Sequence, residues 1–323
     1  MRKENEKPLI SIVMLNYNGL KYLKKTLPPI LKLDYPSYEF IIVDNGSTDK
    51  SIEFIKKFKK IKIIENGENL GYSKGKNIGV KHAKGDYILL LDNDILIKTP
   101  ELLSSLLEVA LPNRLIQIPL LNINSRSTNY LGIYFELYGQ KFNIPEIKIN
   151  KILNDNKLKP IGSFNGGFIF FNKKCWENLG FFDESQILYI DDTDMGGRAW
   201  IYGNSVYLYS KTFAIHLGIK RSVEETYIKR FRLFFSGHAR SMIKNYKLYN
   251  LIYRLPIFYL FQLIKSIRYS FEKRTIKIFS AFIYSNYLFL KNLPDTLKQR
   301  KIIQSKRIIQ EDIFLKIKPP KFD

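Results

Sequence analysis

The sequence contains little cysteine and histidine, which limits the metal sites it can form. Its single cysteine, Cys175, excludes a disulfide scaffold and any zinc or iron–sulfur site built from several cysteines. The chain has three histidines, His82, His216 and His238. A metal site in this chain is therefore at most a mixed one, in which other residue types supply most of the ligands.

The sequence also lacks a hydrophobic run long enough to cross a membrane. Residues 9–15 are apolar, but this stretch is too short for a secretory signal or an anchor. Near the C-terminus, residues 255–264 and 278–290 are uncharged, whereas a spanning helix needs about 20 apolar residues. We therefore expect a cytoplasmic protein.

Acidic residues are scarce: the chain has 30 Asp and Glu against 52 Lys and Arg, a net charge of +22. Residues 221–323 carry 22 of the basic and 7 of the acidic residues, and so most of the excess charge. Such a segment attracts nucleic acid, acidic polymers or anionic lipid. A general bias toward Lys and Ile is the alternative explanation. We predict an anionic membrane surface as the partner, and no nucleic acid.

The chain is 45% hydrophobic, enough to bury a sizeable core, and its first 100 residues alternate two patterns. Short apolar, β-branched runs predict strands at residues 9–15, 40–43, 61–64 and 87–91. Helical spacing predicts helices at residues 19–33, 51–58 and 74–83. This alternation indicates an α/β fold with a mostly parallel sheet, whose ligands bind at the carboxyl ends of the strands.

Polar side chains follow three of these strands. Asn16 and Asp44 end the first two, and Asp92 and Asp94 directly follow the run at 87–91. Two carboxylates one residue apart can approach one divalent cation, and Mg²⁺ and Mn²⁺ favour such oxygen ligands together with substrate phosphates. We therefore predict a site with Mg²⁺ or Mn²⁺ at this edge of the sheet.

Two further segments carry polar residues. Asp191, Asp192 and Asp194 form a second acidic cluster, which suits either a general base or the acidic first turn of a helix. The glycine-rich stretch around Lys76 and Asn77 suits either contact with a diphosphate or a flexible basic loop. By spacing alone, His216 fits a structural residue better than a ligand.

Together these segments resemble family 2 glycosyltransferases of the GT-A type, in the rhamnosyltransferase-like branch. The resemblance covers about residues 9–220 and is carried by the following segments: 11–19 (SIVMLNYNG), 42–49 (IVDNGSTD), 69–79 (NLGYSKGKNIG), 85–94 (GDYILLLDND), 166–171 (GGFIFF), 180–184 (GFFDE), 191–198 (DDTDMGGR) and His216. It implies a GT-A catalytic domain at 1–220, with a nucleotide-sugar half at about 1–100 and an acceptor half at about 101–220. Residues 221–323 then form a basic, aromatic-rich helical C-terminal region.

The resemblance also implies roles for individual residues, in an inverting single displacement from a nucleoside-diphosphate sugar to a glycan or lipid-linked acceptor. Asp192 would be the general base, next to Asp191. Asp94 and His216 would hold the cation. The residues expected around the nucleotide sugar are Asn16, Asp44, Lys76, Asn77 and Asp92, of which Asp92 is also a candidate metal ligand. Such an enzyme would serve cell-surface polysaccharide biosynthesis.

The chain departs from the family pattern at three places. Asp191-Asp192 replaces the usual Glu-Asp, and Lys76 stands where Arg is common. Gly196-Gly197 is unusually flexible for a helix start, which leaves the beginning of that helix undecided. A non-catalytic membrane- or polyanion-binding protein with the same fold is the alternative, but it would not need the full acidic set. A sugar-nucleotide pyrophosphorylase is disfavoured because its glycine-rich basic signature is absent.

The last third of the chain admits two interpretations. Tyr227, Phe231, Phe234 and Phe235 recur at helical spacing among Lys and Arg. This pattern predicts amphipathic helices lying on the inner face of the cell membrane, near a lipid-linked acceptor. The alternative is a helical bundle packed on the catalytic domain or across a homodimer.

Overall fold

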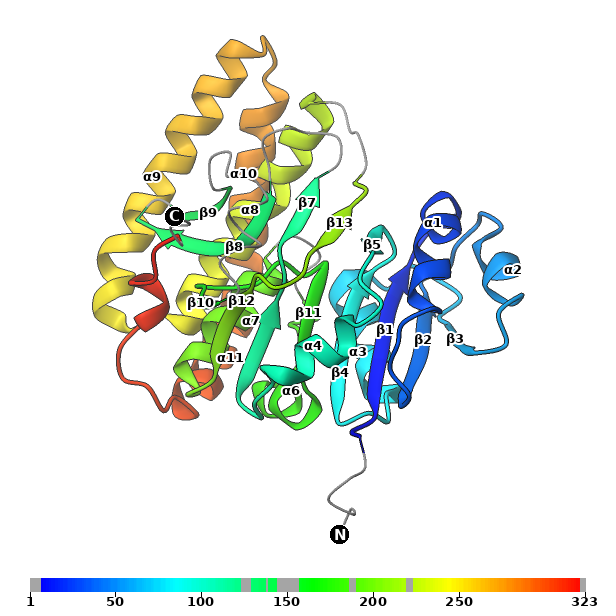
Figure 1. Cartoon of the computed structure of the whole chain (residues 1–323). Coiled ribbons are helices and arrows are strands. Elements are labelled where there is room, and N and C mark those ends of the chain that lie inside the picture. The colour runs from blue at the N-terminus through cyan, green and yellow to red at the C-terminus, as the bar shows by residue number, and fades with distance from the viewer. Residues whose placement is uncertain are drawn as a thin grey trace.

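The structure is a computed structural model. It describes residues 7–122, 129–137, 139–143, 157–185, 190–218 and 223–319. A central mixed sheet lies between helices, and a group of long helices covers one side of the molecule (Figure 1). The described part therefore has the predicted α/β architecture with a C-terminal helical region.

The main sheet has the strand order β10-β12-β6-β11-β4-β1-β2-β3. Its strands are β1 (Ile10–Asn16), β2 (Tyr38–Asp44), β3 (Ile61–Glu65), β4 (Tyr87–Asp92), β6 (Arg114–Gln117), β10 (Leu158–Pro160), β11 (Phe168–Asn172) and β12 (Ser205–Tyr209). β1 runs parallel to both β2 and β4, with Asn16 beside Asp44 and Leu15 beside Asp92. Because these strands are parallel and in register, their polar ends meet at one edge, as the sequence predicts.

Two apolar clusters cover the two faces of this sheet. One packs the sheet against α1 (Leu20–Ile30), α2 (Ser51–Ile55) and α4 (Leu102–Glu108). The other packs it against α3 (Tyr72–His82), α6 (Lys173–Leu179) and α7 (Asp191–Ile201). The sheet is therefore buried on both faces, which explains why its parallel strands read as nearly continuous apolar runs.

Helix α3 lies very close to the sheet because two of its glycines face the strands. A Cβ on Gly79 would lie 2.4 Å from the side chain of Val13, and one on Gly75 would lie 2.5 Å from Leu15. The glycine-rich stretch is thus a packing surface at the start of a helix. This close packing determines how far the side chains of Lys76 and Asn77 lie from the ends of the strands.

A smaller sheet has the order β5-β13-β7-β8-β9. Its strands are β5 (Ile95–Ile97), β7 (Leu120–Asn122), β8 (Asn129–Glu136), β9 (Gly139–Asn143) and β13 (Ala214–His216). β13 pairs antiparallel with β5, which places His216 beside Ile95. Since β5 begins just after Asp94, this pairing brings His216 back to the end of β4.

The C-terminal helices are α8 (Val223–Asn245), α9 (Leu248–Glu272), α10 (Lys277–Lys291) and α11 (Leu293–Ser305), followed by the 3-10 turn η1 (Ile313–Leu315). Phe231 and Phe235 of α8 are buried, and Phe235 stacks on Phe258 and contacts Phe282 edge-on. For these two aromatics the prediction of a membrane-facing helix is wrong, because they form the interior of a bundle. The side chain of Tyr227 lies outside the described residues.

The apolar core continues across residue 220. A single cluster joins Trp176 and Met195 of the N-terminal part to Phe282 and Phe314 of the C-terminal part. The chain also returns to α7, because Ile308 and Ile309 both donate backbone hydrogen bonds to the carbonyl of Ile201. The division at residue 220 stays a prediction, and the packing shows that the two parts share one core.

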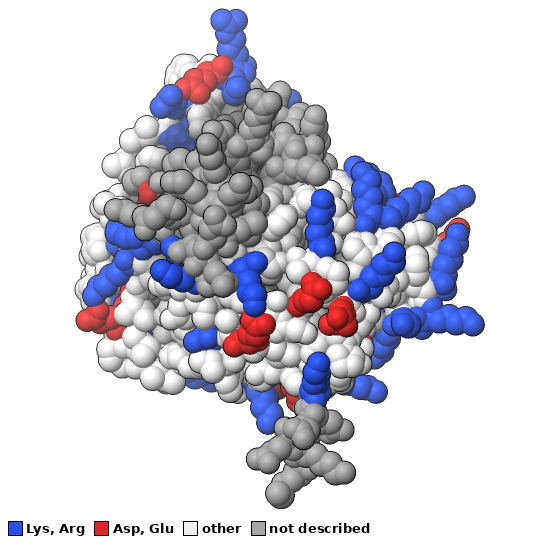
Figure 2. All heavy atoms as spheres, viewed as in Figure 1, with Lys and Arg blue, Asp and Glu red and all other residues white. Residues whose placement is uncertain are grey.

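Basic side chains are not confined to the C-terminal third. Figure 2 shows Lys and Arg crowded over the edge of the molecule that α1, α2 and β3 form in Figure 1. Among the described residues, no helix is both long enough and apolar enough to cross a bilayer.

Candidate active site

The loops after β1 and β2 are joined by side-chain hydrogen bonds. Asn16 is buried and donates to Oδ1 of Asp44 over 2.8 Å and to Ser47 over 3.1 Å. Asp44 also accepts from the backbone and the hydroxyl of Ser47, so both of its carboxylate oxygens are hydrogen-bonded. Asn93, between Asp92 at the end of β4 and Asp94, donates to Oδ1 of Asn16. The ends of three strands thus form one connected polar rim.

Lys76 is the buried cation of this rim. Its Nζ lies 2.7 Å from Oδ1 of Asp92 and donates to the hydroxyl of Tyr72 at 2.6 Å and the carbonyl of Gly166 at 2.5 Å. The lysine side chain is fully buried, whereas that of Asp92 is 27% exposed. Lys76 therefore holds one carboxylate oxygen of Asp92, while part of the Asp92 side chain remains exposed.

Asn77 faces a different group. Its amide donates to the carbonyl of Phe182 and to Glu184, and its oxygen accepts from the backbone of Phe182. The side chain is 1% exposed. These bonds hold the segment that follows α6, so the structure places Asn77 in a supporting position beside the rim.

Asp94 and His216 face each other, with Nε2 of His216 3.1 Å from Oδ2 of Asp94. Burial lowers the pKa of His216, but its hydrogen bond and charge interaction with Asp94 outweigh this and raise the pKa above its usual value. Nδ1 of His216 is buried without a hydrogen-bond partner. An imidazole nitrogen and a carboxylate oxygen this close together are suitable ligands for one divalent cation.

In the described ranges no three His, Cys, Asp or Glu side chains are grouped closely enough to enclose a metal ion. Asp94 and His216 would offer a cation two side-chain ligands. Mg²⁺ and Mn²⁺ sites with one or two carboxylates commonly complete their coordination with substrate phosphates and water. The residues present fit a metal that arrives with a phosphorylated substrate.

The second acidic cluster lies at the start of α7, which begins at Asp191 and runs unbroken through Gly196 and Gly197. All three aspartates lie in its first turn, so the helix start that the sequence left undecided is at Asp191, and Asp191 and Asp192 lie inside the helix, not before it. A Cβ on Gly196 would lie 1.8 Å from the hydroxyl of Ser163. Gly196 thus permits close contact, and Ser163 donates to the backbone carbonyl of Asp192 over 2.6 Å.

The two neighbouring carboxylates differ in their hydrogen bonds. Asp192 is partly exposed and accepts from the backbone N–H groups of Gly166 and Thr193. Burial raises the pKa of both aspartates, and these two bonds oppose the increase for Asp192. The pKa of Asp191 rises further because the charge of Asp192 adds to the effect of burial. The hydrogen bonds to Asp192 therefore favour it as the ionised member when the pair shares one proton.

Gly166 connects the two halves of the site. Its carbonyl accepts from Lys76, and its N–H donates to Oδ2 of Asp192 over 3.1 Å. A Cβ at this position would lie 2.6 Å from the hydroxyl of Tyr72, so a larger residue here would displace that hydroxyl. The backbone of Gly166 therefore links Lys76, beside the end of β4, to Asp192 in the first turn of α7.

Sequence reasoning did not single out four residues that build this site: Ser47, Tyr72, Asn93 and Gly166. All four lie in segments that carry the family resemblance. Tyr72 had a local signal, since it precedes Lys76 by four residues and so shares its helix face. Gly166 had no such local signal, because only the packing of β11 against β4 brings it into contact with Lys76.

Comparison with known proteins gives consistent results. The family model described as Glycosyl transferase family 2 matches residues 11–180. Glycosyltransferase GlyG of Streptococcus pneumoniae is 32% identical over 150 residues, which are 45% of this chain and 49% of GlyG. A putative teichuronic acid biosynthesis glycosyltransferase, TuaG of Bacillus subtilis, is 33% identical over 28% of this chain and 37% of its own length.

The fold has solved counterparts. The mannosyltransferase PcManGT from Pyrobaculum calidifontis, in complex with GDP-Man and Mn²⁺, superposes with a TM-score of 0.56 at 16% identity, covering 94% of this chain and 86% of that one. This similarity shows that the chain has the fold of GT-A enzymes.

Proposed function

The chain belongs to glycosyl transferase family 2, and from this premise we propose that it transfers a sugar from a nucleoside-diphosphate donor to a glycan or lipid-linked acceptor with inversion. The arrangement of Asp192 supports this proposal most directly. It is the partly exposed member of an acidic pair, and Gly166 connects it to the rim that carries Asp92.

In the proposed mechanism Asp192 removes the proton from the acceptor hydroxyl. The hydroxyl oxygen then attacks the anomeric carbon from the face opposite the leaving nucleoside diphosphate, so one C–O bond forms as the other breaks. Gly166 and Thr193 orient the carboxylate through their N–H groups. Because these bonds favour the ionised form, Asp192 is ready to act as a base.

The remaining residues position the donor. Asn16 and Asp44 border the nucleotide side, and Asp92 lies toward the ribose with its charge held by Lys76. Asp94 and His216 would hold Mg²⁺ or Mn²⁺, and the bound cation would neutralise charge on the leaving diphosphate. Asn77 supports the site through Phe182.

A panel of UDP-, dTDP- and GDP-sugars tests the proposed function. We expect purified protein to hydrolyse one of these donors slowly, and only with Mn²⁺ or Mg²⁺, because water replaces the acceptor at Asp192. Released nucleoside diphosphate is measured with and without chelator. If no donor turns over while one binds with metal, the non-catalytic alternative is favoured instead.

We further propose that α9 attaches the protein to an anionic membrane surface. The helix presents a stripe of exposed apolar side chains at helical spacing: Tyr249, Ile252, Ile257, Leu260, Ile264, Ile267 and Phe271. Basic residues lie beside it, among them Arg254, Lys265 and Arg268. A helix of this kind suits the lipid interface, where each nearby basic residue adds about 1 kcal/mol. Attachment would place the site near a lipid-linked acceptor of cell-surface polysaccharide synthesis.

Flotation with liposomes measures this attachment. The unmodified protein should float with anionic vesicles at low salt, and less at high salt, since charge attraction is screened. Leu260→Asp with Ile264→Asp should abolish flotation, whereas Leu297→Asp, an exposed position on α11, should leave it unchanged. A protein that never floats with anionic vesicles contradicts the proposal. A homodimer through the same stripe would instead appear as a doubled mass that the α9 variant removes.

A further inference from the structure

The last two turns of α8 carry an unusual group of buried polar side chains. Lys244 is fully buried, and Arg240, Ser241 and Asn245 are each exposed by 3% or less. Burying charges requires partners, because each loses its hydration. Arg240 contacts Asp295 and Thr296 of α11. Other partners of the group lie in the N-terminal part of the molecule, on either side of the acidic pair.

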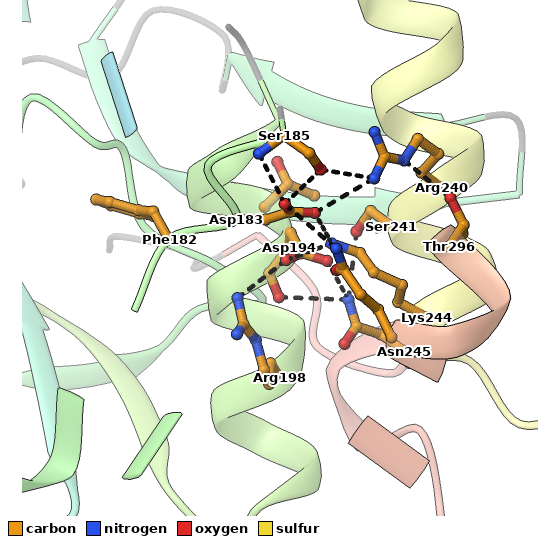
Figure 3. Close-up of polar contacts among 12 residues, drawn as sticks. Phe182, Asp183, Ser185, Asp194, Arg198, Arg240, Ser241, Lys244, Asn245 and Thr296 are labelled. Atoms are coloured by element: carbon orange, nitrogen blue, oxygen red, sulfur yellow. Dashed lines mark hydrogen bonds and ion pairs between the residues drawn. The ribbon is translucent and has the colours of Figure 1, made fainter. Parts of the chain in front are cut away.

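Lys244 contacts two carboxylates that are far apart in the sequence. Its Nζ lies 2.9 Å from Oδ2 of Asp194 and 2.7 Å from Oδ2 of Asp183 (Figure 3). Asp183 precedes the acidic pair Asp191-Asp192, and Asp194 follows it. One buried lysine therefore fixes the chain before and after the proposed base.

Asp194 has two further partners. Asn245 donates to its Oδ1 over 2.8 Å, and Arg198, one turn later in α7, donates to its Oδ2 over 3.0 Å. Figure 3 shows Asp194 turned toward α8 and enclosed by these side chains. Since Asp194 and Asp192 share the first turn of α7, a shift of the backbone at Asp194 would also shift Asp192.

Asp183 is held in the same way. Arg240 lies 3.6 Å from its Oδ2 and donates to Ser185 over 2.7 Å. Burial alone would raise the pKa of Asp183, but the charge and hydrogen bond of Lys244 bring it well below its usual value. The carboxylate therefore stays ionised and bound to Lys244 near neutral pH.

We propose that Lys244 and Asn245 are positioning residues for Asp192, so that the C-terminal helices form part of the catalytic unit. The inference rests on the proposed role of Asp192 as base. Asp192 is held on one side by Gly166 and Ser163. On the other side the turn that carries it is held by α8. The α8 contacts are not made to β1, β2 or β4, so we expect their loss to lower turnover more than donor binding.

Lys244→Met tests the proposal by separating turnover from donor affinity. We expect kcat for metal-dependent donor hydrolysis to fall about tenfold or more, because a misplacement of roughly 1 Å costs up to about 100-fold. The dissociation constant of the donor should stay within about twofold. Phe282→Leu is the control: it loosens the apolar contact between α10 and α8 without touching the polar group.

If Lys244→Met does not fold, Asn245→Ala replaces it, because this variant removes one neutral donor to Asp194 and leaves every charge in place. We expect its kcat to fall while donor affinity is retained. A folded variant with unchanged kcat overturns the proposal, and so does an equal loss of kcat in Phe282→Leu.

Hydrogen exchange separates this proposal from the proposed function. If the unmodified protein hydrolyses no donor, the function fails, and backbone protection in the first turn of α7 then decides about positioning. We expect these amides, including the N–H of Asp194 that donates to Ile190, to exchange faster in Asn245→Ala than in Phe282→Leu. Equal protection in both variants overturns the positioning role.

Discussion

Replacement of Asp192 by Asn is expected to lower kcat by about 10²- to 10⁴-fold, the contribution of a positioned general base. An amide cannot take the proton of the acceptor hydroxyl. Its oxygen still accepts from the N–H of Gly166, so the local fold and donor affinity should be retained. Initial rates at saturating donor measure the first expectation, and calorimetry with donor and metal measures the second.

The matched control is Asp191→Asn. Burial and the neighbouring charge of Asp192 raise the pKa of Asp191, which favours this carboxyl as the protonated member of the pair. An amide resembles a protonated carboxyl in shape and charge, and the loss of kcat should be small. If Asp191→Asn abolishes turnover and Asp192→Asn does not, the assignment within the pair is wrong.

The pH dependence follows from the same pair. Burial raises the pKa of Asp192, and a base works only when ionised. Activity is therefore full above the raised pKa and is lost as the pH falls through it. The acidic limb of the kcat profile should lie above the usual range of an aspartate and vanish in Asp192→Asn.

Replacement of Asp94 by Asn is expected to remove the metal dependence of donor binding. The carboxylate faces Nε2 of His216 at 3.1 Å, and an amide is a much weaker ligand for Mg²⁺ or Mn²⁺. We expect donor affinity with metal to fall at least about tenfold, or roughly 1.4 kcal/mol. Without metal, the variant and the unmodified protein should bind the donor equally well.

Glu53→Gln provides a control for the lost charge, because Glu53 is an exposed carboxylate on α2. It should bind donor and metal as the unmodified protein does. Calorimetry that shows unchanged metal-dependent affinity in Asp94→Asn would show that Asp94 holds no cation.

Local sequence patterns determined much of this protein. Apolar runs with turn residues predicted β1, β2, β3 and β4 close to their observed ends. Parallel pairing in register then placed Asn16, Asp44 and Asp92 at one edge. These predictions were correct because the residue pattern of a strand and the direction of a βαβ unit depend on residues close together in the sequence.

The tertiary structure decided the contacts that join distant segments. His216 reaches Asp94 only because β13 pairs with β5, and Gly166 reaches Lys76 only because β11 lies beside β4. Phe235 is an apolar residue in a segment with many Lys and Arg, which is also the pattern of a membrane-facing residue. In the structure it is buried against Phe258. Lys244 reads as one more basic residue of the C-terminal third, and only packing reveals its contacts with Asp183 and Asp194. A sequence pattern gives the face of a helix that is apolar or charged, but the partner of that face is set by the long-range packing that buries it.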